Sequence, residues 1–326
     1  GAPEGGIAND AGVFGGEVTI WRNDTGWRND ASFYGNPDLF ASAGRTAAIS
    51  NNGGTIIFGD NAGKTAGSWE GSAKVFRYIN NTWKQIGETI YGEVNSYAPV
   101  VDINNDGTKI ALGVWNYSDS RTNIGHVRIF ELNQTSACLD GQAGNGCWSE
   151  IGEIRGTVDN DQCGTDISMD GNGNTIAILC SGYDGSRGQV KIFDYIDGTW
   201  AQHGNLINGE NEEDHYIESG SVALSTNGDY VVIGSNWNDG TDQEAGSARI
   251  FKYNSECTSN TCSEVDTWIQ VGNDIDGERL KDFSGFSVAI NALGTRVAIG
   301  APQNDGDSGD ISDERGHVRI YKWVEY

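Results

Sequence analysis

One phrase recurs six times along the chain and constrains its fold more than any other feature. It begins with glycine and then alternates polar and apolar residues, as in Gly188-Gln-Val-Lys-Ile-Phe193. Alternation with a period of two is typical of a β-strand that has one buried face. The copies begin at Gly16, Gly71, Gly125, Gly188, Gly246 and Gly316. The sequence therefore predicts a fold assembled from one repeated unit.

Two further phrases complete this unit. A tryptophan followed by a glycine comes after most copies, as in Trp268-Ile-Gln-Val-Gly272. A hairpin with a glycine-containing turn precedes five of them, most clearly at residues 287–300. We name the two hairpin strands A and B, the glycine phrase C and the tryptophan phrase D. Four antiparallel strands per unit, with no helical pattern between them, predict the blades of a β-propeller.

The repeats extend over the whole chain, so residues 1–326 are expected to form a single all-β propeller domain. Its C strands begin near residues 16, 71, 125, 188, 246 and 316, which favours six or seven blades, although the sequence alone does not decide between five, six and seven. Five A–B hairpins stand against six C strands, so the ring is either closed by pairing of the termini or incomplete. The 47 glycines suit the many tight turns of such a fold.

The last unit resembles a known family of extracellular repeats. Phe283-Ser-Gly-Phe-Ser-Val-Ala289 and Val297-Ala-Ile-Gly-Ala-Pro302 are similar to the FG-GAP repeat of integrin α-subunit propellers. The resemblance implies cell-surface adhesion, with matrix or ligand binding and often calcium in the A–B loops. Only Asp102, Asn104 and Asp106 keep oxygen ligands at alternating positions, so they are the candidate Ca²⁺ site. A plain hairpin turn is the alternative explanation of these residues.

The six cysteines fall into three local pairs, Cys138–Cys147, Cys163–Cys180 and Cys257–Cys262. The even count and the absence of a Cys-x-x-Cys motif favour disulfides over metal ligation. Disulfides indicate an oxidising compartment, so a secreted or cell-surface protein is expected. Candidate N-glycosylation sites stand at Asn23, Asn80, Asn116 and Asn133.

The B–C and D–A loops of an up-and-down blade share one face of a propeller, and this face is rich in aromatic and acidic residues. Such residues suit a protein interface or the recognition of glycans. Alternatively, the aromatic residues fill space between blades and the acids are solvated. The candidate partner-face residues are Trp69, Trp115, Tyr183, Trp237, Asp305, Asp307 and Asp310.

Charge and length exclude some classes of partner. The net charge of −25 opposes binding to nucleic acid, whose phosphates would be repelled. It favours solubility and the binding of cations or of a basic partner. No apolar run is long enough to span a membrane.

The sequence also gives no catalytic motif. His126 and His317 occupy the same position at the start of a C strand, so they are interpreted as features of the repeat. No nucleophile elbow, phosphate loop or His-Glu-x-x-His motif is present. We therefore expect no enzyme, but an extracellular propeller that mediates protein binding, adhesion or assembly with copies of itself on a surface or in a matrix. The alternatives are a lectin that uses the B–C loop aromatics and a carbohydrate-active enzyme with a pair of carboxylates.

Overall fold

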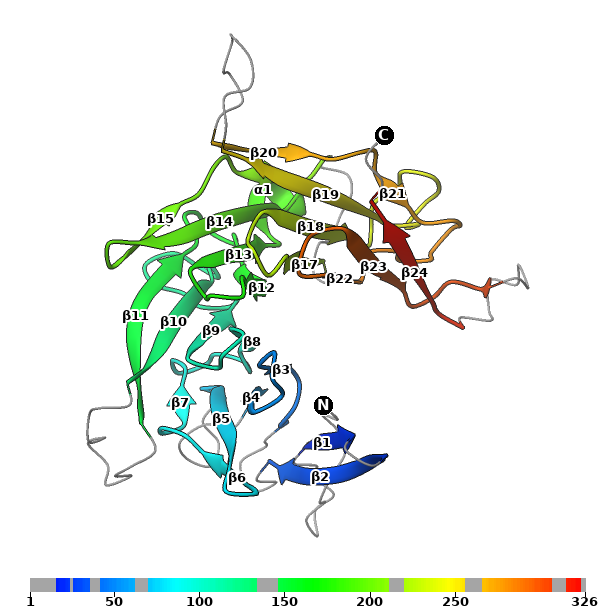
Figure 1. Ribbon diagram of the computed structural model, residues 1–326. Helices are drawn as coiled ribbons and strands as arrows, with labels where there is room; N and C mark the ends of the chain where they lie inside the picture. Colours follow the sequence, from blue (N-terminus) through cyan, green and yellow to red (C-terminus); the bar gives the residue numbers. More distant parts are fainter. Residues whose placement is uncertain are drawn as a thin grey trace. The chain divides into compact units, whose positions relative to one another are not determined.

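The computed structural model describes residues 16–23, 26–35, 42–61, 70–133, 146–210, 220–255, 266–306 and 315–323. They form antiparallel sheets whose strands follow one another in chain order, as in the blades of a β-propeller (Figure 1). The chain divides into two compact units. The first contains Gly1–Tyr117 and Val127–Glu153, and the second contains Ser118–His126 and Ile154–Tyr326.

The first unit contains a two-stranded ribbon and two blades. The ribbon consists of β1 (Glu17–Asn23) and β2 (Trp27–Tyr34). The next blade consists of β3 (Ala47–Ile49), β4 (Thr55–Asp60), β5 (Ser72–Ile79) and β6 (Thr82–Gln85), with β7 (Ile90–Tyr91) paired to β5. The last blade of the unit consists of β8 (Val100–Ile103), β9 (Lys109–Val114), β10 (His126–Asn133) and β11 (Cys147–Arg155).

The second unit contains three blades, and the short turn α1 (Tyr183–Ser186) links two strands of the first. That blade consists of β12 (Cys163–Met169), β13 (Thr175–Cys180), β14 (Gln189–Ile196) and β15 (Thr199–Gln202), with β16 (Ile207–Asn208). The second consists of β17 (Ser221–Leu224), β18 (Tyr230–Ser235), β19 (Ser247–Asn254) and β20 (Thr267–Gln270), with β21 (Ile275–Asp276). The third consists of β22 (Ser287–Ile290), β23 (Arg296–Ala301) and β24 (His317–Lys322).

The all-β propeller with antiparallel sheets is confirmed, but the blade number is corrected. The described residues form five sheets of three or more strands, where six or seven blades were expected. The expectation counted every C strand as a blade, whereas β1, the first C strand, pairs only with β2 in its sheet. The single domain and the closure by the termini stay predictions.

The C strands β5 and β14 bury their alternate residues between neighbouring sheets, as their pattern indicates. In the second unit, Val190 and Ile192 of β14 pack against residues of β17, β18 and β19 in the next blade. In the first unit, Ala73 and Val75 of β5 pack in the same way against the β8–β11 blade. The glycine that precedes each C strand has a second role. At Gly125 and Gly246, φ is +69° and +75°, and a Cβ would collide with the backbone of Cys163 or Ser284 in the following blade.

The tryptophan phrase is explained by a contact between blades. The indole of Trp148 lies against Gly87 of the preceding blade, and Trp268 lies in the same way against Gly204. Trp148 Nε1 donates to the carbonyl oxygen of Ile86 at 3.0 Å, and Trp268 Nε1 donates to that of His203 at 3.0 Å. The tryptophan and the glycine of the repeated phrase are thus the two halves of one inter-blade contact, which we call the tryptophan latch.

The predicted disulfide Cys163–Cys180 is present and joins opposite residues of β12 and β13. The other two predicted pairs, Cys138–Cys147 and Cys257–Cys262, involve Cys138, Cys257 and Cys262, which lie outside the described residues. Within the described part of the chain, no helix is long and apolar enough to cross a membrane.

Candidate active site

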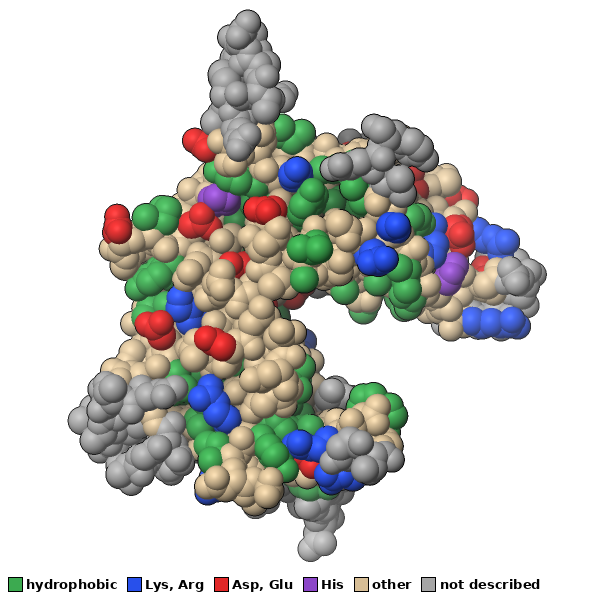
Figure 2. All heavy atoms as spheres, in the orientation of Figure 1, with side chains coloured by type: hydrophobic (Ala, Val, Ile, Leu, Met, Phe, Trp, Pro, Cys, Tyr) green, Lys and Arg blue, Asp and Glu red, His purple; other side chains and the backbone are tan. Residues whose placement is uncertain are grey.

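The side chains of a glutamate, a histidine and an arginine lie close together at the start of β24. His317 and Arg319 are two residues apart on the strand, so they project from the same face. Glu278 approaches them from the loop after β21. Its Oε2 lies 3.6 Å from His317 Nδ1, and its Oε1 lies 3.7 Å from Arg319 Nη1. Acidic, basic and histidine side chains gather over this end of the β22–β24 blade (Figure 2).

The arginine of this cluster is held firmly, while the acid and the imidazole remain open to solvent. Arg319 Nη2 donates to the carbonyl oxygen of Asp276 at 2.6 Å and to Ser284 Oγ at 3.2 Å. Its side chain is largely buried, whereas those of Glu278 and His317 are exposed. A molecule from solvent can therefore reach the imidazole and the carboxylate without displacing the arginine from its backbone partner.

Buried polar residues shape the loop that carries Glu278. Asp282 Oδ2 accepts hydrogen bonds from the backbone N–H groups of Glu278 and Arg279 at 3.1 Å and 3.0 Å. Asn304 Nδ2 donates to the same oxygen at 2.8 Å and to Glu278 Oε2 at 3.3 Å. These hydrogen bonds fix the conformation of the loop and the orientation of the Glu278 side chain. An acid–base site needs its groups to be held in place in this way.

The preceding blade carries an equivalent cluster without the histidine. Glu210 Oε1 lies 3.8 Å from Arg249 Nη1, and Asn238 Nδ2 donates to Glu210 Oε2 at 3.4 Å. Arg249 Nη2 donates to the carbonyl oxygen of Asn208 at 2.9 Å, as Arg319 does to Asp276. Ser247 takes the place of His317 at the start of its strand. The arginine, the acid and the amide are therefore shared by these two blades, and the last blade has an imidazole where the preceding blade has the hydroxyl of Ser247.

This arrangement provides the groups for a hydrolytic reaction. An imidazole can take a proton from water, a neighbouring carboxylate can stabilise the imidazolium that forms, and a guanidinium can stabilise developing negative charge. Neither Arg319 nor Asn304 is among the residues that the sequence pattern singles out, and the repeat led to the interpretation of His317 as a structural residue. The signal available in the sequence was the difference from Ser247 at the same repeat position.

A second acid–histidine pair belongs to the tryptophan latch. His203 Nδ1 lies 2.6 Å from Asp194 Oδ2, and Thr175 Oγ1 donates to Asp194 Oδ1 at 2.7 Å. Burial raises the pKa of Asp194, but the hydrogen bonds from His203 and Thr175 outweigh it, so the pKa lies below its ordinary value. The imidazole packs against the Tyr253 ring in a tilted arrangement, with ring centroids 3.9 Å apart, and the backbone carbonyl of His203 accepts the hydrogen bond from Trp268. This packing assigns the pair a structural role.

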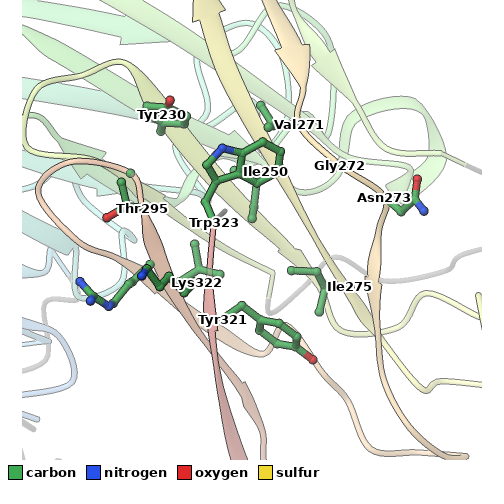
Figure 3. A pocket seen from close by; sticks show the side chains of 13 residues that line it. Tyr230, Ile250, Val271, Gly272, Asn273, Ile275, Thr295, Tyr321, Lys322 and Trp323 are labelled. Atoms are coloured by element: carbon green, nitrogen blue, oxygen red, sulfur yellow. The ribbon is translucent and has the colours of Figure 1, made fainter. Parts of the chain in front are cut away.

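A cavity of about 220 Å³ lies between the β17–β20 and β22–β24 blades, at the opposite end of β24 from His317. Trp323 projects toward Val271 and Ile250 at one side of it (Figure 3). Gly272 holds the position that Gly87 and Gly204 hold in the other latches, but the tryptophan beside it, Trp323, lies farther away: an added Cβ would lie 3.5 Å from Trp323 Cζ3, against 2.5 Å and 2.8 Å from the indoles at Gly87 and Gly204. The cavity therefore lies where the other latches have a close tryptophan, and Trp323 only borders it.

Two aromatic residues of the predicted partner face, Trp115 and Trp237, pack against other aromatic rings. Trp115 is stacked on Tyr97 with ring centroids 5.6 Å apart, and Trp237 meets Phe283 edge to face at 5.0 Å. Asp305 is buried. Tyr183 begins α1. Trp69, Asp307 and Asp310 lie outside the described residues. A role of this face in binding stays a prediction.

The candidate calcium residues lie in the β8–β9 hairpin, where their oxygens stabilise the turn. Asn104 Oδ1 accepts hydrogen bonds from the N–H groups of Thr108 and Lys109, each at 2.9 Å. Asp106 Oδ1 accepts from Thr108 N at 3.0 Å, and Asp102 Oδ1 accepts from Ile103 N at 2.8 Å. Among the described residues, no group of three or more His, Cys, Asp or Glu side chains could hold a metal ion. Calcium binding is therefore unsupported here, and so stays a prediction, as does glycosylation at Asn23, Asn80, Asn116 and Asn133.

The fold places the chain among the β-propellers, and comparisons with known proteins agree with this. No protein-family profile and no curated protein matches the sequence. A solved protein of Bacteroides uniformis, described as a candidate 6-phosphogluconolactonase, is similar with a TM-score of 0.50 and 16% identity over 80% of this chain. The match spans 65% of that protein, just under two thirds of its length. The periplasmic gluconolactonase of Pseudomonas aeruginosa has a TM-score of 0.52 and 12% identity, over 90% of this chain and 73% of its own.

At these identities the likeness establishes the β-propeller fold, and it corrects two expectations. No match supports an FG-GAP or integrin-type repeat. The non-catalytic adhesion protein is contradicted, because both similar propellers carry the names of enzymes. Motifs of adjacent residues do not reveal such a site, because Glu278 and His317 come together from segments that are far apart in the chain.

Proposed function

We propose that the protein is an enzyme that hydrolyses a sugar lactone and that Glu278, His317 and Arg319 form its active site. The observation that carries the proposal is the meeting of an imidazole, a carboxylate and a fixed guanidinium at one exposed position. The names of the two similar propellers indicate the class of reaction, since both are lactonase names.

The reaction follows from the roles that these groups can take. His317 accepts a proton from water while the water oxygen bonds to the lactone carbonyl carbon. Arg319 stabilises the negative charge that develops on the carbonyl oxygen, and Glu278 stabilises the imidazolium. The ring C–O bond then breaks, and the imidazolium returns its proton to the leaving oxygen. The product is the open hydroxy acid, whose carboxylate is released into solvent.

The charge of the protein favours an uncharged lactone over a phosphorylated one. With a net charge of −25, the surface repels an approaching phosphate dianion. The described cluster offers one fully charged cation, Arg319, and its charge is partly balanced by Glu278. A neutral aldonolactone meets no such barrier. The Cys163–Cys180 disulfide supports a location outside the reducing cytosol, where such a sugar would be met in unphosphorylated form.

The test is a pH-stat assay of acid release from glucono-δ-lactone, compared with glucono-δ-lactone 6-phosphate and corrected for spontaneous hydrolysis. We expect faster turnover of the neutral lactone. His317→Ser reproduces the residue of the preceding blade and should keep the fold, yet lower kcat/KM about 100-fold or more, as expected for the loss of a general base. Glu278→Gln should also lower kcat/KM.

The matched control is Glu210→Gln, which makes the same change in the equivalent cluster that lacks a histidine. This variant should keep wild-type activity. If wild-type protein gives no acceleration over buffer, the proposed reaction is wrong. If the Glu210 and Glu278 variants lose activity equally, the proposed site is wrong.

A further inference from the structure

The cavity between the β17–β20 and β22–β24 blades has a volume of about 220 Å³, and every residue that lines it belongs to the second unit. Its walls are mostly apolar and include three aromatic rings, those of Tyr230, Tyr321 and Trp323 (Figure 3). An apolar cavity of about 150 Å³ is large enough to hold benzene. This cavity therefore has room for an aromatic molecule of one or two rings.

The backbone at Val271 and Gly272 is suited to hold a flat ring that carries an N–H group. In the equivalent segment of the preceding blade, the indole of Trp268 lies against Gly204, and its Nε1 donates to the carbonyl oxygen of His203 at 3.0 Å. Val271 and Gly272 are the equivalent pair, and both line the cavity. A ring that lies against Gly272 can therefore donate a hydrogen bond to the Val271 carbonyl oxygen.

Trp323 provides an aromatic surface next to this position. Its backbone N–H donates to the carbonyl oxygen of Thr295 at 2.9 Å, as that of Tyr253 donates to Asp229 at 2.9 Å in the preceding blade. The Tyr253 ring lies beside the latch indole of Trp268, with ring centroids 5.4 Å apart. Trp323 therefore lies where the repeat places the aromatic neighbour of an indole, and ring pairs of this kind are favourable.

The charge of the cavity lining is opposite to that of the chain. The net charge is −25, yet none of the described residues that line the cavity is acidic, and two of them, Arg296 and Lys322, are basic. These two residues are directly opposite each other on β23 and β24, where like charges are unfavourable. Within the described ranges, neither side chain forms an ion pair with a carboxylate. An anion bound beside them would reduce this repulsion.

We propose that the cavity binds a small aromatic carboxylate, with its ring between Gly272 and Trp323 and its carboxylate beside Arg296 and Lys322. Both basic residues are exposed, so the charged end of such a ligand stays in contact with water while its ring is buried. A sugar lactone does not suit the apolar walls, and a neutral aromatic ring leaves the two cations without a counter-charge. The proposal is independent of the proposed lactonase activity, since no residue of the candidate active site lines the cavity.

The experiment is isothermal titration calorimetry of the full chain with three probes that share one ring and differ in charge: indole-3-acetate, 3-methylindole and tryptamine. We expect indole-3-acetate to bind about fivefold more tightly than 3-methylindole, and tryptamine to bind more weakly than both. Added salt should weaken the binding of indole-3-acetate and leave that of 3-methylindole almost unchanged. Binding governed by the net charge alone would give the reverse order, because −25 attracts the tryptamine cation.

Two charge variants test the role of the basic residues. Arg296→Gln and Lys322→Gln should each lower the affinity for indole-3-acetate about threefold without changing that for 3-methylindole. Lys281→Gln is the matched control, because it removes the same charge from an exposed residue of the same unit that does not line the cavity. Unchanged binding of 3-methylindole also shows that the variants are folded.

Gly272→Ala tests the position of the ring. The new Cβ would lie 3.5 Å from Trp323 Cζ3 and narrow the space for the ring, so the affinity for indole-3-acetate and for 3-methylindole should fall about tenfold. Gly198→Ala is the control for backbone strain, because φ at Gly198 is +85° and a Cβ there meets nothing within 4 Å. This control should leave the binding of both probes unchanged.

Three results would each overturn the proposal. If none of the probes binds to the wild-type chain, the cavity is closed or is filled by the chain itself. If tryptamine binds as tightly as indole-3-acetate, the basic residues do not select the ligand. If Gly272→Ala leaves the binding of every probe unchanged, the probes bind elsewhere.

Discussion

Three glycines at equivalent positions allow the energy of the tryptophan latch to be measured. Gly204 and Gly272 both lie in the second unit, with φ of +73° and +78°, so replacement by alanine imposes the same backbone strain at each. They differ in what the new Cβ would meet. At Gly204 it would lie 2.8 Å from Trp268 Cδ1, whereas at Gly272 the nearest atom is Trp323 Cζ3 at 3.5 Å. Gly272→Ala is therefore the matched control for Gly204→Ala.

The expected magnitudes follow from this difference. A left-handed conformation costs an alanine about 1–2 kcal/mol, and both variants incur that cost. At Gly204 the displaced indole adds an overpacking cost of about 1–3 kcal/mol. The displacement also weakens the bond from Trp268 Nε1 to the His203 carbonyl, which is worth about 1 kcal/mol. Gly204→Ala should therefore lower the free energy of unfolding by about 2 kcal/mol more than Gly272→Ala.

The assay is urea unfolding followed by far-UV circular dichroism, with the m-value checked for constancy so that the midpoint reports stability. In a Trp268→Ala background the steric difference is gone, and Gly204→Ala should cost no more than Gly272→Ala does. Equal losses from Gly204→Ala and Gly272→Ala in the wild-type background would refute the latch as a source of stability.

Three other predictions concern the second unit. Replacing Cys163 and Cys180 by serine removes a link between residues 17 apart in sequence and should lower the free energy of unfolding by about 3 kcal/mol, measured by urea unfolding against the same protein with reductant added. Asp194 has a lowered pKa in the folded state, so its contribution to stability is complete above its unfolded pKa of about 4 and is lost as pH falls through the lower folded value. Asp194→Asn should therefore flatten the loss of stability below about pH 4, and an unchanged slope in acid unfolding curves would contradict this. The cavity beside Gly272 has the place of an indole, so free indole should raise the unfolding midpoint in a concentration-dependent way, and Gly272→Ala should reduce the effect.

Sequence periodicity predicted the strands well because each blade repeats the same local pattern. The C strands at Gly71, Gly125, Gly188 and Gly246 fall where the glycine phrase placed them, and Cys163 and Cys180 face each other across the predicted hairpin. Pairing within a blade is decided by neighbouring strands of one hairpin or meander, so local sequence is sufficient for it. Local sequence was not sufficient to predict the number of blades, because that number depends on which strands pair with one another at the two ends of the repeat array.

The candidate site was missed for a physical reason as well. A residue that recurs at the same position of a repeat suggests a structural role. His126 and His317 share a position at the start of a C strand, so both were interpreted in this way. Their surroundings differ: His126 is fully buried, whereas His317 is exposed beside Glu278. The loop acid comes from another blade, about forty residues earlier in the chain, and sequence spacing carries no sign of this contact.

Equivalent residues of the repeat therefore have different roles, depending on which residues of the next blade lie against them. The Val-x-Ile phrase of β14 is core, because the β17–β20 blade covers it, whereas the same phrase in β24 is exposed surface. The serine that begins β19 becomes a histidine in β24, next to an arginine and an acid that both blades share. The latch glycine after β15, Gly204, lies against an indole, and its counterpart Gly272 borders a cavity. All three departures from the repeat involve the β22–β24 blade or its contact with the β17–β20 blade, so this part of the chain is where a function beyond the fold is best sought.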